Sequence, residues 1–338
     1  MLTGKVVLAF DNYLSSYGTL TFRIPTHGTT AAMNIVTPYK YRCEVWRDNN
    51  CVWKGIIVDN PSRNNYYIQV QAHTLEFLLS KVQVANDAGK DLRTQTGTMS
   101  SMITTLMNEG ISRGNSPISG ITLGTIDNPV YPWDGTTPWT FSDTYQFKLV
   151  YSNLFATINT FSDVTRADWS IDYNGVFNFK QQIGADRTDV AFKYGKGGNV
   201  VAFDSPLDGS NMVNDFMLIT QSQDGSNLVK APKNDTSTYG DYGDLWGVKG
   251  ISDMITQDFA NQKAQHIFNL NKSFDTQLFL DLAGNAMPVG SWDLGDKVNV
   301  DIQDGPISFN KKVRIIGWKT TVSDLGVERT QLITNQDF

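Results

Sequence analysis

Hydrophobic and polar positions alternate along several short segments of this 338-residue chain. In segment 19–24 the apolar residues take the even positions and the polar residues take the odd ones. Segment 67–72 repeats this alternation, while segments 39–47 and 52–58 have strand character and flank a polar turn. A period of two is typical of strands with one buried and one wet face. Residues 1–80 therefore predict a small antiparallel barrel or sandwich.

The period then changes to that of a helix. Apolar residues in segment 99–107 recur at three- and four-residue spacing, which predicts an amphipathic helix with Thr96 or Thr98 as its N-cap. The same spacing returns in segment 154–161, where Ser152 is the candidate cap.

The second half of the chain mixes turn signals with strands. Asn174-Gly175, between two strand-like runs, predicts a hairpin. Segment 224–244 is rich in Asp, Asn, Gly, Ser, Thr and Tyr without an apolar period, which predicts a long exposed loop. A third helix is expected to begin with Ser252 as its cap. Further strands are expected at 200–202, 216–220, 297–302, 313–318 and 329–333.

These elements predict a mainly β fold with an α+β insertion. The inserted helix/strand domain is expected at 90–184, and one linking helix is expected within 236–272. The side chains expected in the interior are Leu20, Phe22, Ile24, Ile68, Val70, Leu154, Phe155, Ile158, Val298, Val300 and Ile315.

Composition narrows the function classes. The formal net charge of −6 and the lack of a basic stripe argue against tight non-specific DNA binding, which needs clustered Lys and Arg. No apolar run approaches the roughly 18 residues of a membrane span, and no targeting segment is recognisable. Cys43 and Cys51 flank a turn; two-residue turn geometry would put them on opposite faces, whereas a three-residue loop would allow a disulfide. We expect free thiols.

The chain shows no catalytic signature, and we expect neither catalytic residues nor a cofactor. The three histidines, His27, His73 and His266, have no partner at metal-ligand spacing, so no metal site is expected either. A paired-carboxylate glycosidase would need two positioned acids. The first three to inspect are Asp134, Asp163 and Asp168, although turn and cap carboxylates explain them more simply.

One local feature favours binding. Three large aromatics, Tyr131, Trp133 and Trp139, lie in a loop punctuated by Pro and Gly. Such a loop is suited to stacking on sugar rings or to anchoring a partner protein, and it is equally suited to folding back on its own domain.

The order of three segments resembles the hub proteins of tailed bacteriophages, a family related to the baseplate hub of contractile-tailed phages. The first is the hairpin 41–58, with a charged turn and a Lys-Gly-Ile-Ile strand. The second is Ser237-Thr238-Tyr239-Gly240, which leads toward the expected third helix. The third comprises a Gly-Asp-Lys-Val strand, an Arg-Ile-Ile strand and a final strand, at 294–300, 313–318 and 324–332.

The resemblance implies a structural role in a virion tail, assembled in the host cytoplasm. It implies two small β-barrel-like domains in each subunit: the first is split between 1–89 and 185–235, around the insertion at 90–184, and the second lies at 273–338, after a linker with a helix at 236–272. Three such subunits would form a ring-shaped homotrimer that presents six similar β units around a channel for DNA. This pseudo-sixfold ring would join the tail tube or distal tail protein to tip or fibre proteins, near the tape measure protein. A negative channel wall would repel phosphate, and the candidate residues for such an acidic lumen face are Asp293, Asp296, Asp301 and Asp304. The alternative is a carbohydrate- or receptor-binding β protein of a phage tail, supported by the aromatic loop.

Overall fold

The structure is a computed structural model. It describes residues 7–25, 36–64, 66–128, 130–132, 138–140, 145–165, 167–221, 227–254, 257–272, 275–284, 287–305 and 307–336.

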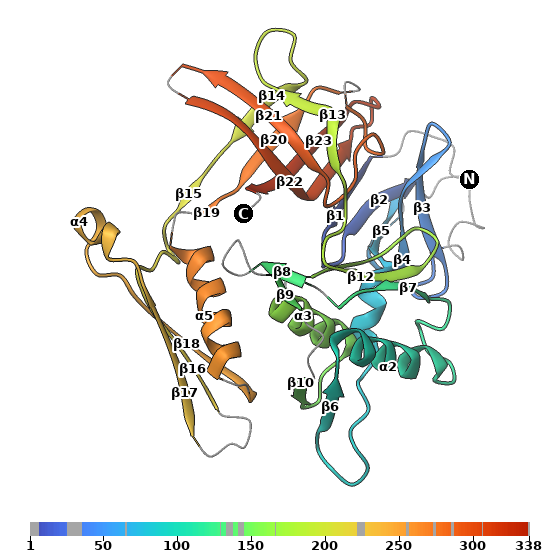
Figure 1. Cartoon of the computed structure of the whole chain (residues 1–338). Coiled ribbons are helices and arrows are strands. Elements are labelled where there is room, and N and C mark those ends of the chain that lie inside the picture. The colour runs from blue at the N-terminus through green and yellow to red at the C-terminus, as the bar shows by residue number, and fades with distance from the viewer. Residues whose placement is uncertain are drawn as a thin grey trace.

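The largest element of the described chain is an eleven-stranded sheet that joins both ends of the sequence (Figure 1). The first third contributes β1 (Leu8–Tyr13), β2 (Thr19–Pro25), β3 (Arg42–Arg47), β4 (Asn50–Arg63) and β5 (Tyr67–Thr74). The later strands are β13 (Asp186–Lys193), β14 (Val200–Asp204), β20 (Leu278–Leu282), β21 (Lys297–Asp304), β22 (Ile307–Val322) and β23 (Glu328–Gln336).

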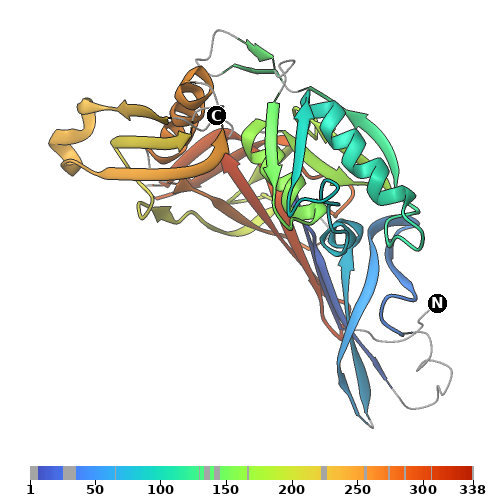
Figure 2. The ribbon, with the colours of Figure 1, turned by 90° about the horizontal axis from the view of Figure 1, so that it is seen from below.

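Strand β1 is the seam of this sheet. It pairs antiparallel with β2 on one side and with β22 on the other. The path of neighbours runs β14-β20-β23-β22-β1-β2-β5-β4-β3, and β21 pairs with both β13 and β22. The strands of the two chain ends therefore share one hydrogen-bond network, and Figure 2 shows the red C-terminal strands running into the blue N-terminal ones.

The inserted region packs below the sheet in Figure 1. A 3-10 helix, η1 (Leu75–Lys81), leads into it. Its two main helices are α2 (Met99–Ser112) and α3 (Leu154–Thr165). Its strands are β6 (Arg93–Gly97), β7 (Thr122–Ile126), β8 (Val130–Pro132), β9 (Pro138–Thr140), β10 (Tyr145–Leu149), β11 (Asp168–Ile171) and β12 (Val176–Lys180).

A smaller unit stands at the left of Figure 1, where a three-stranded sheet carries one helix. It consists of β16 (Asp215–Gln221), β17 (Leu228–Asn234), β18 (Trp246–Met254) and α5 (Gln257–Asn271). The short pair β15 (Leu207–Asp208) and β19 (Asp275–Thr276) connects it to the large sheet.

Two hydrophobic clusters hold the described residues together. One lines the large sheet and mixes side chains from both ends of the chain, such as Phe10, Val70 and Ile315. The other combines the insertion with the smaller unit, and includes Met102, Phe179 and Leu218. No helix among the described residues is long and apolar enough to span a membrane.

The predicted fold class is confirmed: the structure is mainly β with helices in an insertion. Ten of the eleven side chains expected in the interior are buried, and Phe155 is partly buried against the second cluster. The predicted helix cap at Thr98 is also confirmed, because its hydroxyl accepts a hydrogen bond from the Ser101 amide at 3.3 Å. The division into barrel-like domains stays a prediction.

The prediction of a long exposed loop at 224–244 is wrong. Residues 228–234 form β17, which pairs with β16 and buries Val229 and Ala231. The sequence signal was weak because only these two inward positions alternate, and one of them is Ala. A 3-10 turn, η2 (Thr236–Thr238), and the short α4 (Tyr239–Tyr242) follow.

Two predicted helix caps are wrong as well. Ser252 lies inside β18, where pairing with β16 overrides the local cap signal. At the start of α3 the cap is Asn153, whose side-chain oxygen accepts from the Ala156 amide at 2.8 Å. Asn and Ser are equally good N-caps, so composition alone does not choose between Asn153 and its neighbour Ser152.

The geometry of the β3–β4 hairpin shows whether Cys43 and Cys51 can form a disulfide. Its turn is the two-residue Asp48-Asn49, with φ values of 46° and 65°, as a type I′ turn requires. Cys43 lies opposite Gly55 and not opposite Cys51, and both thiols are free.

Candidate functional site

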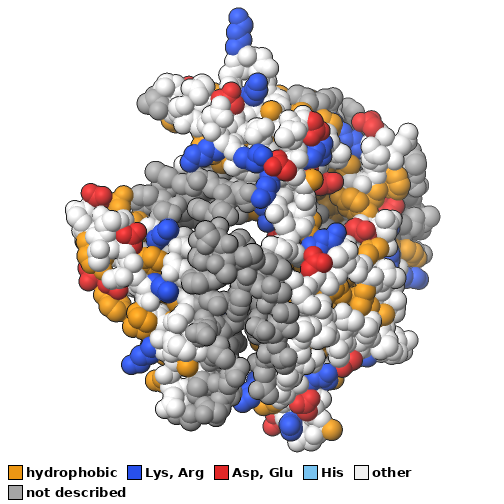
Figure 3. Space-filling view, viewed as in Figure 1, with side chains coloured by type: hydrophobic (Ala, Val, Ile, Leu, Met, Phe, Trp, Pro, Cys, Tyr) orange, Lys and Arg blue, Asp and Glu red, His pale blue; other side chains and the backbone are white. Residues whose placement is uncertain are grey.

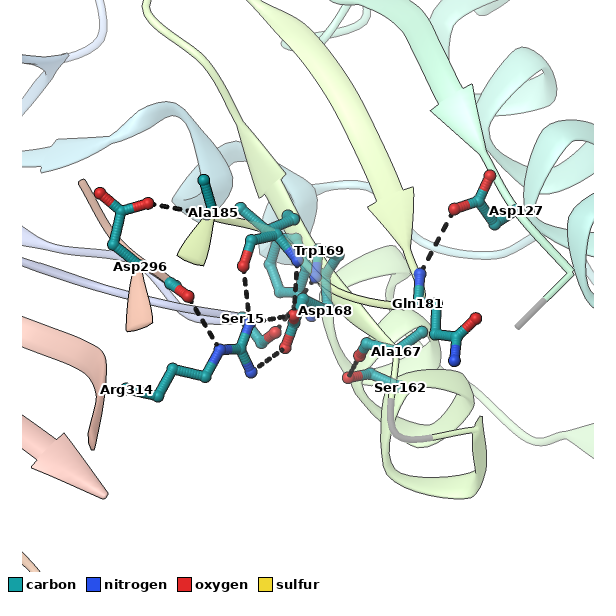
Figure 4. A network of polar contacts seen from close by, with 12 residues as sticks. Ser15, Asp127, Ser162, Ala167, Asp168, Trp169, Gln181, Ala185, Asp296 and Arg314 are labelled. Carbon is teal, nitrogen blue, oxygen red and sulfur yellow. Dashed lines mark hydrogen bonds and ion pairs between the residues drawn. The ribbon is translucent and has the colours of Figure 1, made fainter. Parts of the chain in front are cut away.

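A polar cluster of the described chain ties the insertion to the closing strands (Figure 4). Asp168, at the start of β11, is 7% exposed. Both its carboxylate oxygens accept hydrogen bonds from the guanidinium of Arg314 on β22, and one also accepts from the Ile183 amide at 2.7 Å. Arg314 donates further to the carbonyls of Ile183 and Gly295, at 2.8 and 3.1 Å. Hydrogen bonds with the backbone therefore hold both the carboxylate of Asp168 and the guanidinium of Arg314 in place.

A second buried carboxylate completes this junction. Asp296 is 3% exposed. Its oxygens accept from the backbone amides of Ala185 at 2.8 Å and Asp293 at 2.9 Å, and the Arg187 guanidinium lies 3.4 Å away. Since a carboxylate used in this way is directed into the protein, the prediction that Asp296 belongs to an acidic lumen face is wrong.

The other three candidates for that face are open to solvent to different degrees. Asp293 and Asp304 are exposed and Asp301 is half-buried. Partial desolvation and the nearby carboxylate of Asp296 raise the pKa of Asp293. Asp301 and Asp304 lie on β21, whereas Asp293 lies in the turn before that strand. That these residues line a channel stays a prediction.

The aromatic loop is described only in part. Strands β8 and β9 pair antiparallel and place Tyr131 opposite Trp139. Trp133 lies outside the described residues. Binding of a glycan or partner by these three residues stays a prediction.

The candidate carboxylates for hydrolysis are not brought together as a pair. Asp168 is neutralised by Arg314, and Asp134 lies outside the described residues. Asp163 on α3 is exposed, and partial desolvation raises its pKa against the lowering influence of Lys249 and Lys263.

Among the described residues, no group of three His, Cys, Asp or Glu side chains is arranged to hold a metal ion. The ring of His73 packs against Tyr17 and Phe77, with centroids 5.1 and 4.6 Å apart, and burial lowers its pKa. His27 lies outside the described residues, and His266 lies on α5.

Glu76 is a buried carboxylate that forms no ion pair with a described residue. Glu76 on η1 is 4% exposed, and it accepts a hydrogen bond from the Ile171 amide at 2.9 Å. Burial is the main cause of its raised pKa. Its hydrogen bond joins η1 to β11, so we read Glu76 as part of the insertion's packing.

The described surface also carries an apolar patch and a groove. Figure 3 shows hydrophobic side chains gathered at the left of the molecule, over the β16–β18 sheet, where Leu228, Trp246 and Val248 are exposed. The second is a groove of about 620 Å³ across β23, β22, β1 and β2, flanked by Arg23 and Arg329.

Local sequence patterns do not reveal how the residues of these sites come together. The Asp168–Arg314 pair joins residues 146 positions apart, so no local spacing reveals it. Arg23 could have been singled out as a cation on the wet face of an alternating strand, but its neighbours across the sheet could not.

The fold is that of phage tail proteins. The structure matches the 43 kDa tail protein of prophage MuSo2 from Shewanella oneidensis with a TM-score of 0.68 and 13% identity, over 99% of this chain and 95% of that one. A tail protein from Neisseria meningitidis MC58 matches equally well, at 0.68 and 13%, over 99% of this chain and 97% of the other. The prophage tail protein gp18 of Listeria monocytogenes EGD-e matches with a TM-score of 0.60 and 12% identity, covering 98% of this chain and 89% of that chain.

A fourth similar structure comes from a secretion system. The E. coli c3393 protein, a type VI secretion component described as structurally similar to the T4 tail proteins gp27 and gp5, matches with a TM-score of 0.56 and 10% identity. It covers all of this chain and 75% of that one. No family model and no curated protein matches the sequence, so the likeness is one of fold.

Proposed function

We propose that this chain is a structural subunit of a phage-type tail and acts as its hub in the virion. The observation that carries the proposal is the match of the whole chain to tail proteins of nearly the same length, at a TM-score of 0.68. A fold shared over 99% of the chain includes the insertion and the smaller unit as well as the large sheet. The order of motifs in the sequence supports the same assignment independently.

Within this role, the proposed assembly is a homotrimeric ring with pseudo-sixfold symmetry. Each subunit would supply two β-barrel-like units, from 1–89 with 185–235 and from 273–338, so three subunits present six. One side of the ring would meet the tail tube or distal tail protein, and the other the tip or fibre proteins, with the tape measure protein nearby. One chain would thus bridge sixfold and threefold partners.

The proposed task needs no catalysis. The buried carboxylates Asp168 and Asp296 are engaged in joining segments of the chain, and this supports a structural role for them. DNA would pass through the ring without being held tightly, and a wall that includes Asp293 and Asp301 would repel its phosphates.

The test is the mass and symmetry of the purified full chain, by light scattering and negative-stain imaging. We expect a threefold ring with a central hole, and binding of a tube or distal tail protein to one of its faces. A particle that stays monomeric at high concentration and in the presence of tube protein would contradict the hub. Saturable binding of host polysaccharide by such a monomer, lost on substitution of Tyr131 or Trp139, would favour the receptor-binding alternative.

A further inference from the structure

The groove across the large sheet has a neutral floor and basic sides. Cross-strand pairing aligns Arg329, Thr321, Ala9 and Thr21 in one row over β23, β22, β1 and β2. These residues are on the face opposite the core, because their neighbours Phe10, Leu20 and Phe22 are buried. The small side chains of Ala9 and the two threonines leave a hollow that Val7 and Val327 border. We call it the arginine groove.

Two guanidinium groups flank the arginine groove. Arg329 lies in the aligned row, and Arg23 lies two residues beyond Thr21 on the far strand, so roughly 16 Å separates their backbones at ordinary strand spacing. Arg23 stacks over the ring of Tyr67 at 4.8 Å. Neither arginine forms an ion pair with a described residue, and no carboxylate lines the groove. In a chain of net charge −6, these two guanidinium groups thus have no paired carboxylate among the described residues.

A complementary surface exists at the other end of β22. The β21–β22 hairpin pairs as far as Asp304 and Ile307, which lie opposite each other. Asp304 is exposed and Ile307 is 47% exposed. Segment 299–308 contains two Asp and no Lys or Arg. The hairpin tip, as we call the part that carries Asp304 and Ile307, thus offers an aliphatic side chain beside a carboxylate.

The hairpin tip cannot reach the arginine groove of its own chain. Ile307 begins β22 and Val322, which lines the groove, ends it. The 15 residues between them span roughly 50 Å of extended strand. Each copy therefore carries both halves of a contact that only another copy can complete. A contact between two different surfaces of identical chains is heterologous, and it closes into a ring when the rotation allows.

We propose that the hairpin tip of one subunit docks in the arginine groove of the next. Asp304 pairs with Arg23 or Arg329, and Ile307 covers the small side chains of the floor. This rests on the ring assembly proposed above, and it assigns Asp304 to a subunit contact in place of a channel wall. The contact favours a protein over nucleic acid, because the groove offers aliphatic side chains and no exposed aromatic for base stacking.

A charge swap in the full chain tests the contact. One variant combines Arg23→Glu with Arg329→Glu, a second carries Asp304→Arg, and a third combines all three changes. Each of the first two should raise the dissociation constant of the ring about tenfold or more, and the combined variant should return it to within about threefold of wild type. Ala9→Phe, which fills the floor without changing charge, should also weaken the ring. Lys90→Glu and Asp241→Arg, at exposed sites outside both surfaces, are the controls.

Sedimentation over a range of concentration and salt measures the assembly, and far-UV circular dichroism checks that each variant is folded. A wild-type ring that neither charge reversal nor Ala9→Phe weakens would overturn the contact and leave the ring intact. If the variant with Arg23→Glu and Arg329→Glu lost binding to DNA while its ring assembly stayed unchanged, the subunit contact would also be overturned. The groove would then be assigned to nucleic acid. A wild-type chain that never assembles would overturn the ring itself, and the contact with it.

Discussion

At the scale of single residues, the buried charges of this chain join segments that are remote in sequence. The guanidinium of Arg314 and the carboxylate of Asp168 are 15% and 10% exposed as side chains. Desolvated ions of this kind contribute little net stability as a pair, but each is costly when its partner is removed. The pair therefore acts mainly to fix β11 against β22.

Removing the charge of Asp168 should reveal this dependence. Asp168→Asn keeps the shape of the side chain but leaves the positive charge of Arg314 buried, so we expect a loss of about 2–4 kcal/mol in the free energy of unfolding. Urea titration followed by tryptophan fluorescence measures it. Asp189→Asn is the control, because Asp189 pairs with Arg187 at a site where its side chain is 66% exposed, and it should change stability little. Equal effects of the two variants would contradict this account.

Because Glu76 is buried, we expect its contribution to the free energy of unfolding to change with pH in the opposite direction to that of a carboxylate in a surface ion pair. Burial raises its pKa above the ordinary value of 4.5, so the folded state holds this proton more tightly than the unfolded state does. Its contribution to stability is therefore fully present below pH 4.5 and is lost as pH rises through the folded pKa. Glu76→Gln, which keeps an acceptor for the Ile171 amide, should gain stability relative to wild type on going from pH 4.5 to 7.5.

The control for Glu76 is Glu44, whose pKa is lowered by hydrogen bonds from Lys54 and Trp46. A lowered pKa gives stability that is present above the unfolded pKa and lost as pH falls. Glu44→Gln should therefore show a small trend of the opposite sign, because the group is exposed. Unfolding free energies at several pH values decide between the trends, and a flat difference for Glu76→Gln would refute the burial argument.

Local sequence patterns predict the burial of some residues of this chain and not of others. They identify the interior side chains Phe22, Val70 and Val300, because alternation alone decides which face of a strand these side chains occupy. They wrongly indicate a surface carboxylate at Asp296, since a Gly-Asp pair is typical of an exposed turn. Its partner Arg187 lies on β13 and its partner Ala185 comes just before that strand. Because β13 pairs in parallel with β21 after a long separation in sequence, no local pattern encodes that pairing.

At the scale of elements, strands with a strong alternation of apolar and polar residues can be predicted from the sequence. Strands that are stabilised mainly by pairing with a neighbouring strand cannot. The half-buried β2 and β5 are clear from sequence because their wet faces are consistently polar. Strand β18 was missed because its two glycines and its exposed Trp246 and Val248 obscure any alternation, and it is held by parallel pairing to β16. The helix α5 was expected, but its start was placed too early for the same reason.

The turn of the β3–β4 hairpin offers a prediction at this scale. Both of its central residues, Asp48 and Asn49, have left-handed backbone angles, which cost side chains other than Gly about 1 kcal/mol, and Asn less than most. Asn49→Gly should therefore raise the free energy of unfolding by about 0.5 kcal/mol, and Asn49→Ala should lower it by about 1 kcal/mol. Thermal unfolding of the two variants tests the turn type, and a loss of stability with Gly would contradict it.

At the scale of the whole molecule, the two ends of the chain form one structural unit. The hydrophobic cluster of the large sheet includes side chains from both ends, and the Arg47–Glu328 ion pair, at 2.6 Å, ties the β3–β4 turn to the start of β23. The insertion and the smaller unit share the other cluster. The large sheet and the insertion thus have separate hydrophobic clusters, and the Asp168–Arg314 pair joins β11 of the insertion to β22 of the sheet.

This arrangement predicts which strands a single core substitution destabilises. Phe10, on the seam strand β1, is 4% exposed, and its ring packs edge-on against Trp318 of β22 at 5.3 Å. Phe10→Ala should cost about 3–5 kcal/mol. Because β1 pairs with β2 and β22 together, amide hydrogen exchange should speed up in strands from both ends of the chain, and much less in α2 and α3.

The matched variant in the other cluster is Phe179→Ala, since Phe179 is fully buried in β12. It should reverse the pattern, with faster exchange in α2 and α3 and a largely unchanged large sheet. If Phe10→Ala instead loosened only β2 to β5 and left β22 and β23 protected, the two ends would be separate folding units that merely touch. The seam between β1 and β22 would then be an interface between two halves that fold independently, although they share one sheet.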